Sequence, residues 1–160
     1  MKLTAHFDLS EFTRSESAKR EGLDNTPTPE HLENIKTLCE KILEPIRLRF
    51  GPINISSGYR GKMLNHFIGG AINSDHCVGR AADIDMDDTG AGVTNTDIFN
   101  YIKDNLDYDQ LIWEFGTKEK PDWVHVGYRG KENRKQTLRG NKGKGQDYLR
   151  SILTKTNQYG

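Results

Sequence analysis

The chain has 160 residues, enough for one domain that buries its own core without disulfides or a structural metal. Hydrophobic residues make up 34% and charged residues 29%, a composition that describes a polar globular protein and excludes a fibre or a disordered chain. The formal net charge is 0, but residues 129–150 hold eight Lys or Arg and two acidic residues, a net charge of +6. Lys155 adds one more positive charge, so a mildly acidic body, residues 1–128 with a net charge of −7, precedes a basic, glycine-spaced extension.

The predicted elements begin with an ordered arm over residues 7–29, which is rich in turn-forming residues and holds one or two helical turns. A longer helix follows, because Thr28 is a good N-cap and Pro29 suits the first helical position. Pro45 is expected to loosen the last turn of this helix and Gly51 to end it. Spacings of three and four predict one buried stripe, made of Leu32, Ile35, Leu38, Cys39, Ile42, Leu43 and Ile46.

The remaining segments alternate between strand and helix patterns. Residues 53–60 read as a short strand that runs into a turn, and residues 61–74 as a short helix closed by two glycines. Residues 93–106 form a second amphipathic helix, and residues 108–116 and 122–128 form two strands joined by a hairpin connection. The sequence therefore predicts a single α+β domain with a small, mainly antiparallel sheet packed against helices.

Neither the cysteines nor the N-terminus indicates a secreted or membrane protein. Cys39 lies on the predicted buried stripe, and the two cysteines form no disulfide framework. Cys77 adjoins a histidine, but adjacent side chains usually diverge, so it is not expected to be a metal ligand. The segment "MKLTAHFDLSEF" lacks the apolar run of a signal peptide or a membrane span, and synthesis in the cytoplasm without membrane insertion is expected.

The segment "SDHCVGRAADID" (residues 74–85) concentrates residues that can carry chemistry. Asp83 begins an alternation of polar and apolar residues typical of a half-buried strand, on which Asp85 shares its face. His76 would reach this face from a turn before the strand. Taken alone, the spacing favours a surface turn with a solvated histidine and a strand-capping carboxylate.

A second segment, "PDWVHVGY", changes that balance. Its alternation puts Trp123 and His125 on one face of a strand, where a lone histidine would usually be a packed core residue. Two histidines and a carboxylate on elements that can converge are, however, the ligand set of a catalytic zinc ion, which keeps a fourth position open. His76, Asp83 and His125 are therefore the predicted metal ligands.

Asp122 is the predicted general base for the attacking water, because it lies three residues before His125. An ideal strand points residues i and i+3 to opposite faces, so this role requires Asp122 to lie in an irregular entry after Pro121. Glu114 is the next carboxylate to consider if Asp122 is not the base.

Three linked segments, "SSGYR", "SDHCVGRAADID" and "DWVHVG", resemble the zinc D-Ala-D-Ala carboxypeptidase family of peptidoglycan metallopeptidases, which includes bacteriophage endolysins. The family's Trp-x-His is matched by Trp123 and His125. The resemblance covers roughly residues 6–128. It implies a hedgehog/DD-peptidase-like fold, with a zinc peptidase domain over residues 1–128. Residues 129–160 would then be a basic extension, either part of the same domain or a surface tail. The family's Ser-x-His-x-x-Gly-x-Ala-x-Asp motif is matched by Ser74, His76, Gly79, Ala81 and Asp83.

The resemblance also assigns roles to individual residues. It makes His76, Asp83 and His125 the ligands of one Zn²⁺ ion, Asp122 the acidic base, and Arg60 the arginine that faces the substrate carbonyl. Without the family, Arg60 could equally be a solvated turn residue. His66 gains no role from the resemblance and is expected on the surface, and Asp85 is expected to be a strand-surface carboxylate or a partner of a ligand histidine. Residues expected to contact substrate are Ser74, Trp123 and Tyr59.

The implied function is hydrolysis of a peptide bond in peptidoglycan stem peptides by a monomeric enzyme. The family spans D-Ala-D-Ala carboxypeptidases and endopeptidases of the L-Ala-D-Glu type, and a phage endolysin released onto the cell wall during lysis is the favoured biology. A non-catalytic zinc module of the same fold is the alternative, against which Asp122 and Arg60 argue. Nucleic acid is not an expected partner, because the basic extension has only Tyr148 as an aromatic within residues 129–150. This extension is expected to affect wall binding more than chemistry.

Overall fold

The structure is a computed structural model that describes residues 1–140. Helices and strands alternate along the chain in the α+β manner that the sequence predicts. The helical elements are α1 (Ser10–Thr13), α2 (Glu16–Glu21), α3 (Pro29–Leu38), the π-helix η1 (Cys39–Leu43), α4 (Glu44–Phe50), α5 (Lys62–Phe67), the 3-10 turn η2 (Asp75–Val78), α6 (Asn95–Asn105) and the 3-10 turn η3 (Gly130–Glu132). The strands are β1 (Ile55–Ser57), β2 (Ala81–Ile84), β3 (Gln110–Glu114), β4 (Trp123–Gly127) and β5 (Gln136–Gly140).

The long helical segment α3–η1–α4 begins and ends where the sequence predicts. The Thr28 side chain accepts a hydrogen bond from the His31 backbone N–H, and Gly51 follows the last turn with a φ of 84°. Pro45 has no N–H to donate, and the turn before it widens into the π-helix η1. The buried face of this segment forms one wall of the core with Ile35, Leu38, Cys39, Ile42, Leu43 and Ile46.

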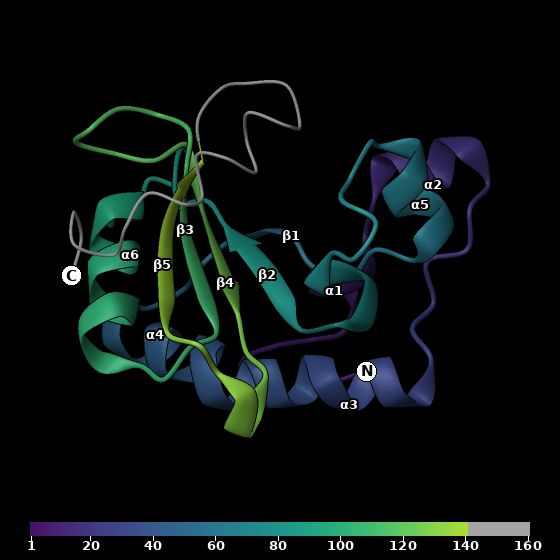
Figure 1. Cartoon of the computed structure of the whole chain (residues 1–160), viewed down its shortest axis with the longest axis horizontal. Helices are drawn as coiled ribbons and strands as arrows, with labels where there is room; N and C mark the ends of the chain where they lie inside the picture. Colours follow the sequence, from purple (N-terminus) through teal and green to yellow (C-terminus); the bar gives the residue numbers. More distant parts are fainter. Residues whose placement is uncertain (141–160) are drawn as a thin grey trace.

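The five strands form one sheet in the order β1-β2-β4-β3-β5 (Figure 1). The pairs β1–β2, β2–β4 and β4–β3 are antiparallel, whereas β3 and β5 are parallel. Val124 and Val126 are fully buried in the core, so the alternating residue His125 projects to the opposite face of the sheet. Figure 1 shows α4 and α6 together on one side of the sheet and α1, α2 and α5 beyond its β1 edge. The predicted α+β class is confirmed.

Strand β5 lies in the segment that the sequence assigned to the basic extension. It pairs with β3 over five residues, from Gln110 opposite Gln136 to Glu114 opposite Gly140. Residues 130–140 therefore lie against the sheet as η3 and β5. The rest of the extension, residues 141–160, lies outside the described residues.

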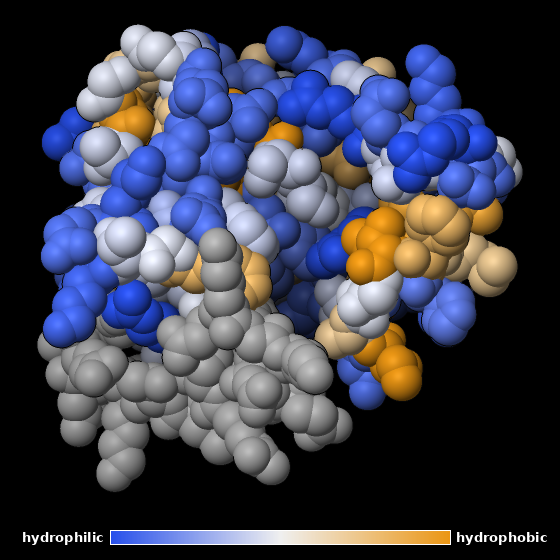
Figure 2. Space-filling model, turned by 90° about the horizontal axis from the view of Figure 1, so that it is seen from above, coloured by the Kyte–Doolittle hydropathy of each residue, from blue (hydrophilic) through white to orange (hydrophobic). Residues whose placement is uncertain are grey.

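The surface is hydrophilic over most of the face seen in Figure 2. That view also shows a hollow beside the end of the molecule formed by α2 and α5, with hydrophobic side chains gathered along that end. Exposed hydrophobic side chains on α5 and in the loop after it are Met63, Phe67, Ile68 and Ile72. Within residues 1–140, no helix combines the length and the apolar character that a membrane span requires.

Candidate metal centre

His76 is positioned by the short turn η2. The side chain of Ser74 caps this turn by accepting a hydrogen bond from the His76 backbone N–H at 3.2 Å. Gly79 ends it with a φ of 76°, where a Cβ would lie only 2.5 Å from the carbonyl oxygen of His31, so only glycine fits. The ring Nδ1 of His76 donates to the Gly58 carbonyl at 2.7 Å. Because Nδ1 carries the proton, Nε2 presents its lone pair toward Asp83 and His125.

Asp83 and His125 are brought together by strand register. They are direct partners in the antiparallel pair of β2 and β4, so both side chains project to the same face. His125 Nδ1 lies 3.0 Å from Asp83 Oδ1 and 3.3 Å from His76 Nε2. Asp83 Oδ1 also lies 3.2 Å from His76 Nε2, which closes a triangle of three ligand atoms.

The triangle has the dimensions of a metal site. Two ligand atoms that each lie about 2.1 Å from a tetrahedral zinc ion are about 3.4 Å apart, close to the 3.0–3.3 Å found here. Within the described part of the chain, His76, Asp83 and His125 are the one group of three His, Cys, Asp or Glu residues close enough to hold a metal. Cys77 is not part of the group, and burial raises the pKa of its thiol, which disfavours the thiolate that metals bind.

Protonation also suits metal binding. Burial lowers the pKa of His76 more than the neighbouring Asp83 charge raises it, so the neutral ring is favoured. Burial raises the pKa of Asp83, but the two adjacent histidine rings outweigh it and hold this pKa well below its usual range. Burial lowers the pKa of His125, but the Asp83 hydrogen bond and the charges of Asp83, Glu114 and Asp75 raise it further than burial lowers it. Protons and a metal ion therefore compete for His125.

Glu114 projects to the same face as the ligands. It is the cross-strand partner of Trp123, and paired residues share a face of the sheet. Trp123 and His125 are two residues apart, so Glu114 lies on the side of His125. The Glu114 side chain is buried, with an exposed fraction of 4%, and its negative charge contributes to the raised pKa of His125.

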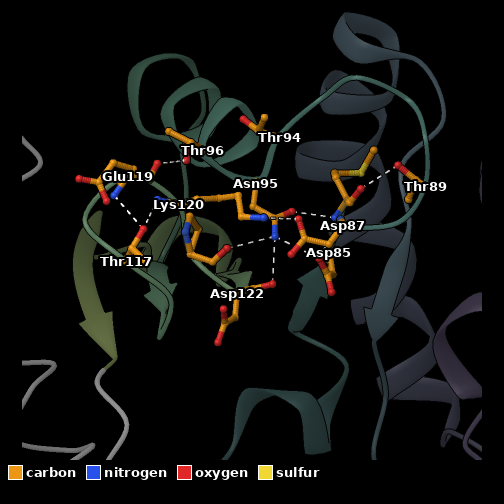
Figure 3. Close-up of polar contacts among 12 residues, drawn as sticks. Asp85, Asp87, Thr89, Thr94, Asn95, Thr96, Thr117, Glu119, Lys120 and Asp122 are labelled. Carbon is orange, nitrogen blue, oxygen red and sulfur yellow. Dashed lines mark hydrogen bonds and ion pairs between the residues drawn. The ribbon is translucent and has the colours of Figure 1, made fainter.

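Asp122 lies in the bend just before β4, the irregular entry that its predicted role requires. Its backbone N–H donates to the Glu114 carbonyl at 2.9 Å, and its own carbonyl accepts from Asn95 Nδ2 at 2.9 Å. Figure 3 shows this carbonyl turned toward Asn95 and the Asp122 carboxylate turned away from it. The hydrogen bond to Asp87 is the main influence that raises the pKa of Lys120 on the hairpin, and the negative charge of Asp122 adds a smaller one.

Asn95 joins the segments that end β2 and begin β4. Its fully buried amide oxygen accepts from the Met86 N–H at 2.7 Å, and its Nδ2 donates to Asp85 Oδ1 at 3.0 Å. The same nitrogen donates to the carbonyls of Pro121 at 3.2 Å and Asp122 at 2.9 Å (Figure 3). The Asp85 carboxylate therefore accepts a hydrogen bond from Asn95. Neither of the two roles expected for Asp85 from the sequence included this contact.

Arg60 lies next to the ligand turn. Its backbone N–H donates to the His76 carbonyl at 3.1 Å, and its positive charge is one of the influences that lower the pKa of His76. The buried Nε of Arg60 has no hydrogen-bond partner among residues 1–140. Arg60 also lines a cavity of about 420 Å³ between β1, α2 and α5, together with Arg14 and Ser57. Its guanidinium is therefore not a simple solvated turn group.

The three residues expected to contact substrate lie in different surroundings. Ser74 is the cap of η2. Tyr59 is buried, and its hydroxyl is hydrogen-bonded to His31 Nδ1 at 3.0 Å, although the residue also lines the cavity beside Arg60. Trp123 is half-buried on the ligand face, and its ring makes an edge contact with Phe115 at a centroid distance of 5.1 Å.

Sequence reasoning missed two residues that position the site, Gly58 and Asn95. Gly58 directly follows β1, and a Cβ on it would lie 2.6 Å from the Cα of Phe12, so the chain can pass there only with glycine. The signal available was the glycine in "SSGYR", since glycine within a strand often marks a close approach of the backbone. Nothing in the sequence around Asn95 distinguishes it from an ordinary polar residue in the first turn of a helix. His66 is exposed, as expected.

The sheet and the His-Asp-His triangle together define a metal-binding α+β domain. The family model described as Peptidase M15 matches residues 5–127. The chain belongs to this family, and the resemblance to the zinc D-Ala-D-Ala carboxypeptidases is confirmed. It is therefore a metallopeptidase. Comparison with curated proteins gives no match.

Proposed function

We propose that this metallopeptidase holds one zinc ion with His76, Asp83 and His125 and hydrolyses a peptide bond in the stem peptides of peptidoglycan. The observation that carries the proposal is the triangle of three ligand atoms, 3.0–3.3 Å apart, in a chain of the Peptidase M15 family. Two neutral imidazoles and one carboxylate are typical ligands of catalytic zinc, which needs a fourth, open position.

Zinc bound there would supply Lewis acidity, which activates a water and polarises the scissile carbonyl. Residues of the chain supply proton transfer and stabilise the negative charge that develops. A carboxylate accepts the proton of the attacking water and passes it to the leaving amine. Arg60 donates to the carbonyl oxygen as negative charge develops, and its place next to the ligand residue His76, whose carbonyl accepts from the Arg60 backbone N–H, supports this role.

Two carboxylates are candidates for the general base. Asp122 was predicted from its spacing to His125, and its place in the bend before β4 leaves it free of strand alternation. Glu114 is supported by strand register, burial and its electrostatic influence on His125. Strand register places Glu114 on the ligand face, and the bend before β4 allows Asp122 to reach that face as its predicted role requires.

Isosteric variants separate the two candidates. Glu114→Gln and Asp122→Asn should both retain zinc, because neither residue is a ligand. The variant that removes the base should lose about a hundredfold or more in turnover of purified muropeptides, followed by mass spectrometry, because a positioned acid–base group has roughly that effect. The other variant should stay within a few-fold of the wild type and serves as the control.

The outcomes also separate the enzyme from a non-catalytic zinc module. If the wild type binds zinc and cleaves no peptidoglycan peptide, the peptidase function fails and the module remains. If both variants are as active as the wild type, only the assignment of the base fails. The mass of the muropeptide products identifies the bond, because a carboxypeptidase releases a single D-Ala, whereas an L-Ala-D-Glu endopeptidase releases the stem from D-Glu onward and leaves L-Ala on the sugar.

An endolysin role is the biological setting that we propose. It is supported by the resemblance of the ligand segments to a family that includes bacteriophage endolysins. Turbidity of a suspension of permeabilised bacteria should fall after addition of the wild-type protein and stay constant with His125→Ala. Equal turbidity loss with both proteins would contradict the proposed role.

A further inference from the structure

Asp75, the residue before the ligand His76, is held by an arginine from a distant part of the chain. Arg129 Nη2 lies 3.0 Å from Asp75 Oδ1 and 3.2 Å from Oδ2, so both carboxylate oxygens face one nitrogen. The Asp75 side chain is only 10% exposed. A carboxylate so far out of water needs a partner, because an uncompensated buried charge is strongly unfavourable.

Arg129 also forms an ion pair with a second buried carboxylate, that of Asp109. Its Nε lies 3.2 Å from Oδ2 of Asp109, whose side chain is fully buried. Arg134 completes the cluster through two hydrogen bonds to Asp109, at 2.9 Å from Nε and 2.8 Å from Nη2. The four charges alternate in sign, so each buried carboxylate has an arginine and Arg129 is shared between both carboxylates.

Backbone contacts connect the same parts of the fold. The Arg80 N–H donates to the Asp75 carbonyl at 2.9 Å, and the Tyr128 N–H donates to the Arg80 carbonyl at 2.9 Å. The residue after Tyr128 is Arg129. The segment that follows β4 is therefore connected to the turn η2 twice, by backbone hydrogen bonds through Arg80 and by the Arg129 side chain on Asp75. His125 is on that same strand, four residues earlier. The turn that carries one ligand is thus fastened to the strand that carries another.

We propose that Arg129 is a positioning residue of the metal centre, which acts through Asp75 to keep the η2 turn, and with it His76 Nε2, at ligand distance from Asp83 and His125. The proposal rests on the metal site proposed above. Without the guanidinium, the Asp75 carboxylate turns toward water and draws the adjoining His76 with it. Arg129 and Arg134 both lie after residue 127, where the match to the Peptidase M15 family ends, so the family match does not assign this contact.

The test is the affinity of the metal-free protein for zinc, measured by competition with a chromophoric chelator. Removing an outer partner of a metal ligand typically weakens metal binding by about 10- to 100-fold, and we expect this for Arg129→Ala. Arg129→Lys, which keeps the charge but not the planar fork, should fall between this variant and the wild type. Arg20→Ala is the matched control, because Arg20 is exposed and, among residues 1–140, pairs only with its neighbour Glu21.

A double-mutant cycle shows whether the effect passes through Asp75. In an Asp75→Asn background, Arg129→Ala should cause little further loss of zinc affinity, because the carboxylate that it restrains is gone. An equal loss in both backgrounds would overturn the proposed route through Asp75.

A purely structural role gives a different result. If Arg129→Ala lowers the melting temperature but binds zinc as tightly as the wild type well below that temperature, the positioning role is wrong and the proposed metal site stands. If the wild type itself binds no zinc, both proposals are overturned. Should Arg129→Ala fail to fold, Arg129→Lys and Arg129→Gln carry the same comparison, and wild-type affinity in both would refute the positioning role.

Discussion

Replacement of Asn95 by alanine tests whether the buried amide holds the two ligand strands together. The substitution removes a side chain that has no exposed surface. That side chain has four hydrogen-bond partners, two just after β2 and two just before β4. Two of these contacts, to the Met86 N–H and the Pro121 carbonyl, are completely buried. An unsatisfied buried backbone group costs about 1–3 kcal/mol, so we expect Asn95→Ala to lower the free energy of unfolding by about 2–6 kcal/mol.

This loss would be a large fraction of the stability of an ordinary domain, which is about 5–15 kcal/mol. Urea unfolding of the metal-free protein, followed by circular dichroism, measures it. Asn105→Ala is the matched control, because Asn105 is on the same helix and is exposed, and within the described part of the chain its side chain makes a single hydrogen bond, to the Tyr101 carbonyl. It should change the free energy of unfolding by less than about 1 kcal/mol, as most exposed substitutions do. A loss for Asn95→Ala no larger than that of the control would refute the reasoning.

Two further predictions concern single contacts. Burial raises the pKa of Asp109, but hydrogen bonds and charge from Arg134 outweigh it and hold this pKa below its usual value. A lowered carboxyl pKa stabilises the fold above the unfolded pKa of about 3.9, and this stabilisation is lost as the pH falls through the folded pKa. Arg134→Ala should therefore destabilise the protein at pH 7 and lose that disadvantage in acid; an equal deficit in urea unfolding at pH 7 and at pH 2 would contradict this. Ser74→Ala should lower the free energy of unfolding by about 1 kcal/mol, because it removes a helix cap, and should leave the KM for a stem peptide unchanged; a several-fold rise in KM would instead support the predicted contact with substrate.

Local patterns in the sequence were sufficient for most helix and strand assignments of the family-matched region, although β2 is Ala81–Ile84 and not the alternating segment that begins at Asp83. Thr28 and Pro29 define a helix start through capping geometry that involves only neighbouring residues. The alternation around His125 likewise fixes which strand residues face the core, because side chains on a strand have a period of two. The same local signals, with the motif spacing, singled out the three residues that form the ligand triangle.

Strand β5 could not be found in this way. Its sequence, "QTLRG", is polar, short and part of a basic stretch, so neither hydrophobic alternation nor composition marks it. It becomes a strand because the parallel edge of β3 offers backbone hydrogen-bonding groups that need partners. That pairing is a property of the assembled sheet.

The sequence by itself determined which residues can bind a metal, because the chemistry of imidazole and carboxylate belongs to the side chains. Only the tertiary structure decided which ring nitrogen of His76 is free, since the Gly58 carbonyl that takes its other nitrogen is 18 residues away. It also decided that Glu114 shares the ligand face and that Arg129 reaches Asp75 across 54 residues. Cross-strand register and buried charge pairing depend on groups that meet only when the chain has folded, so local propensities carry no information about them.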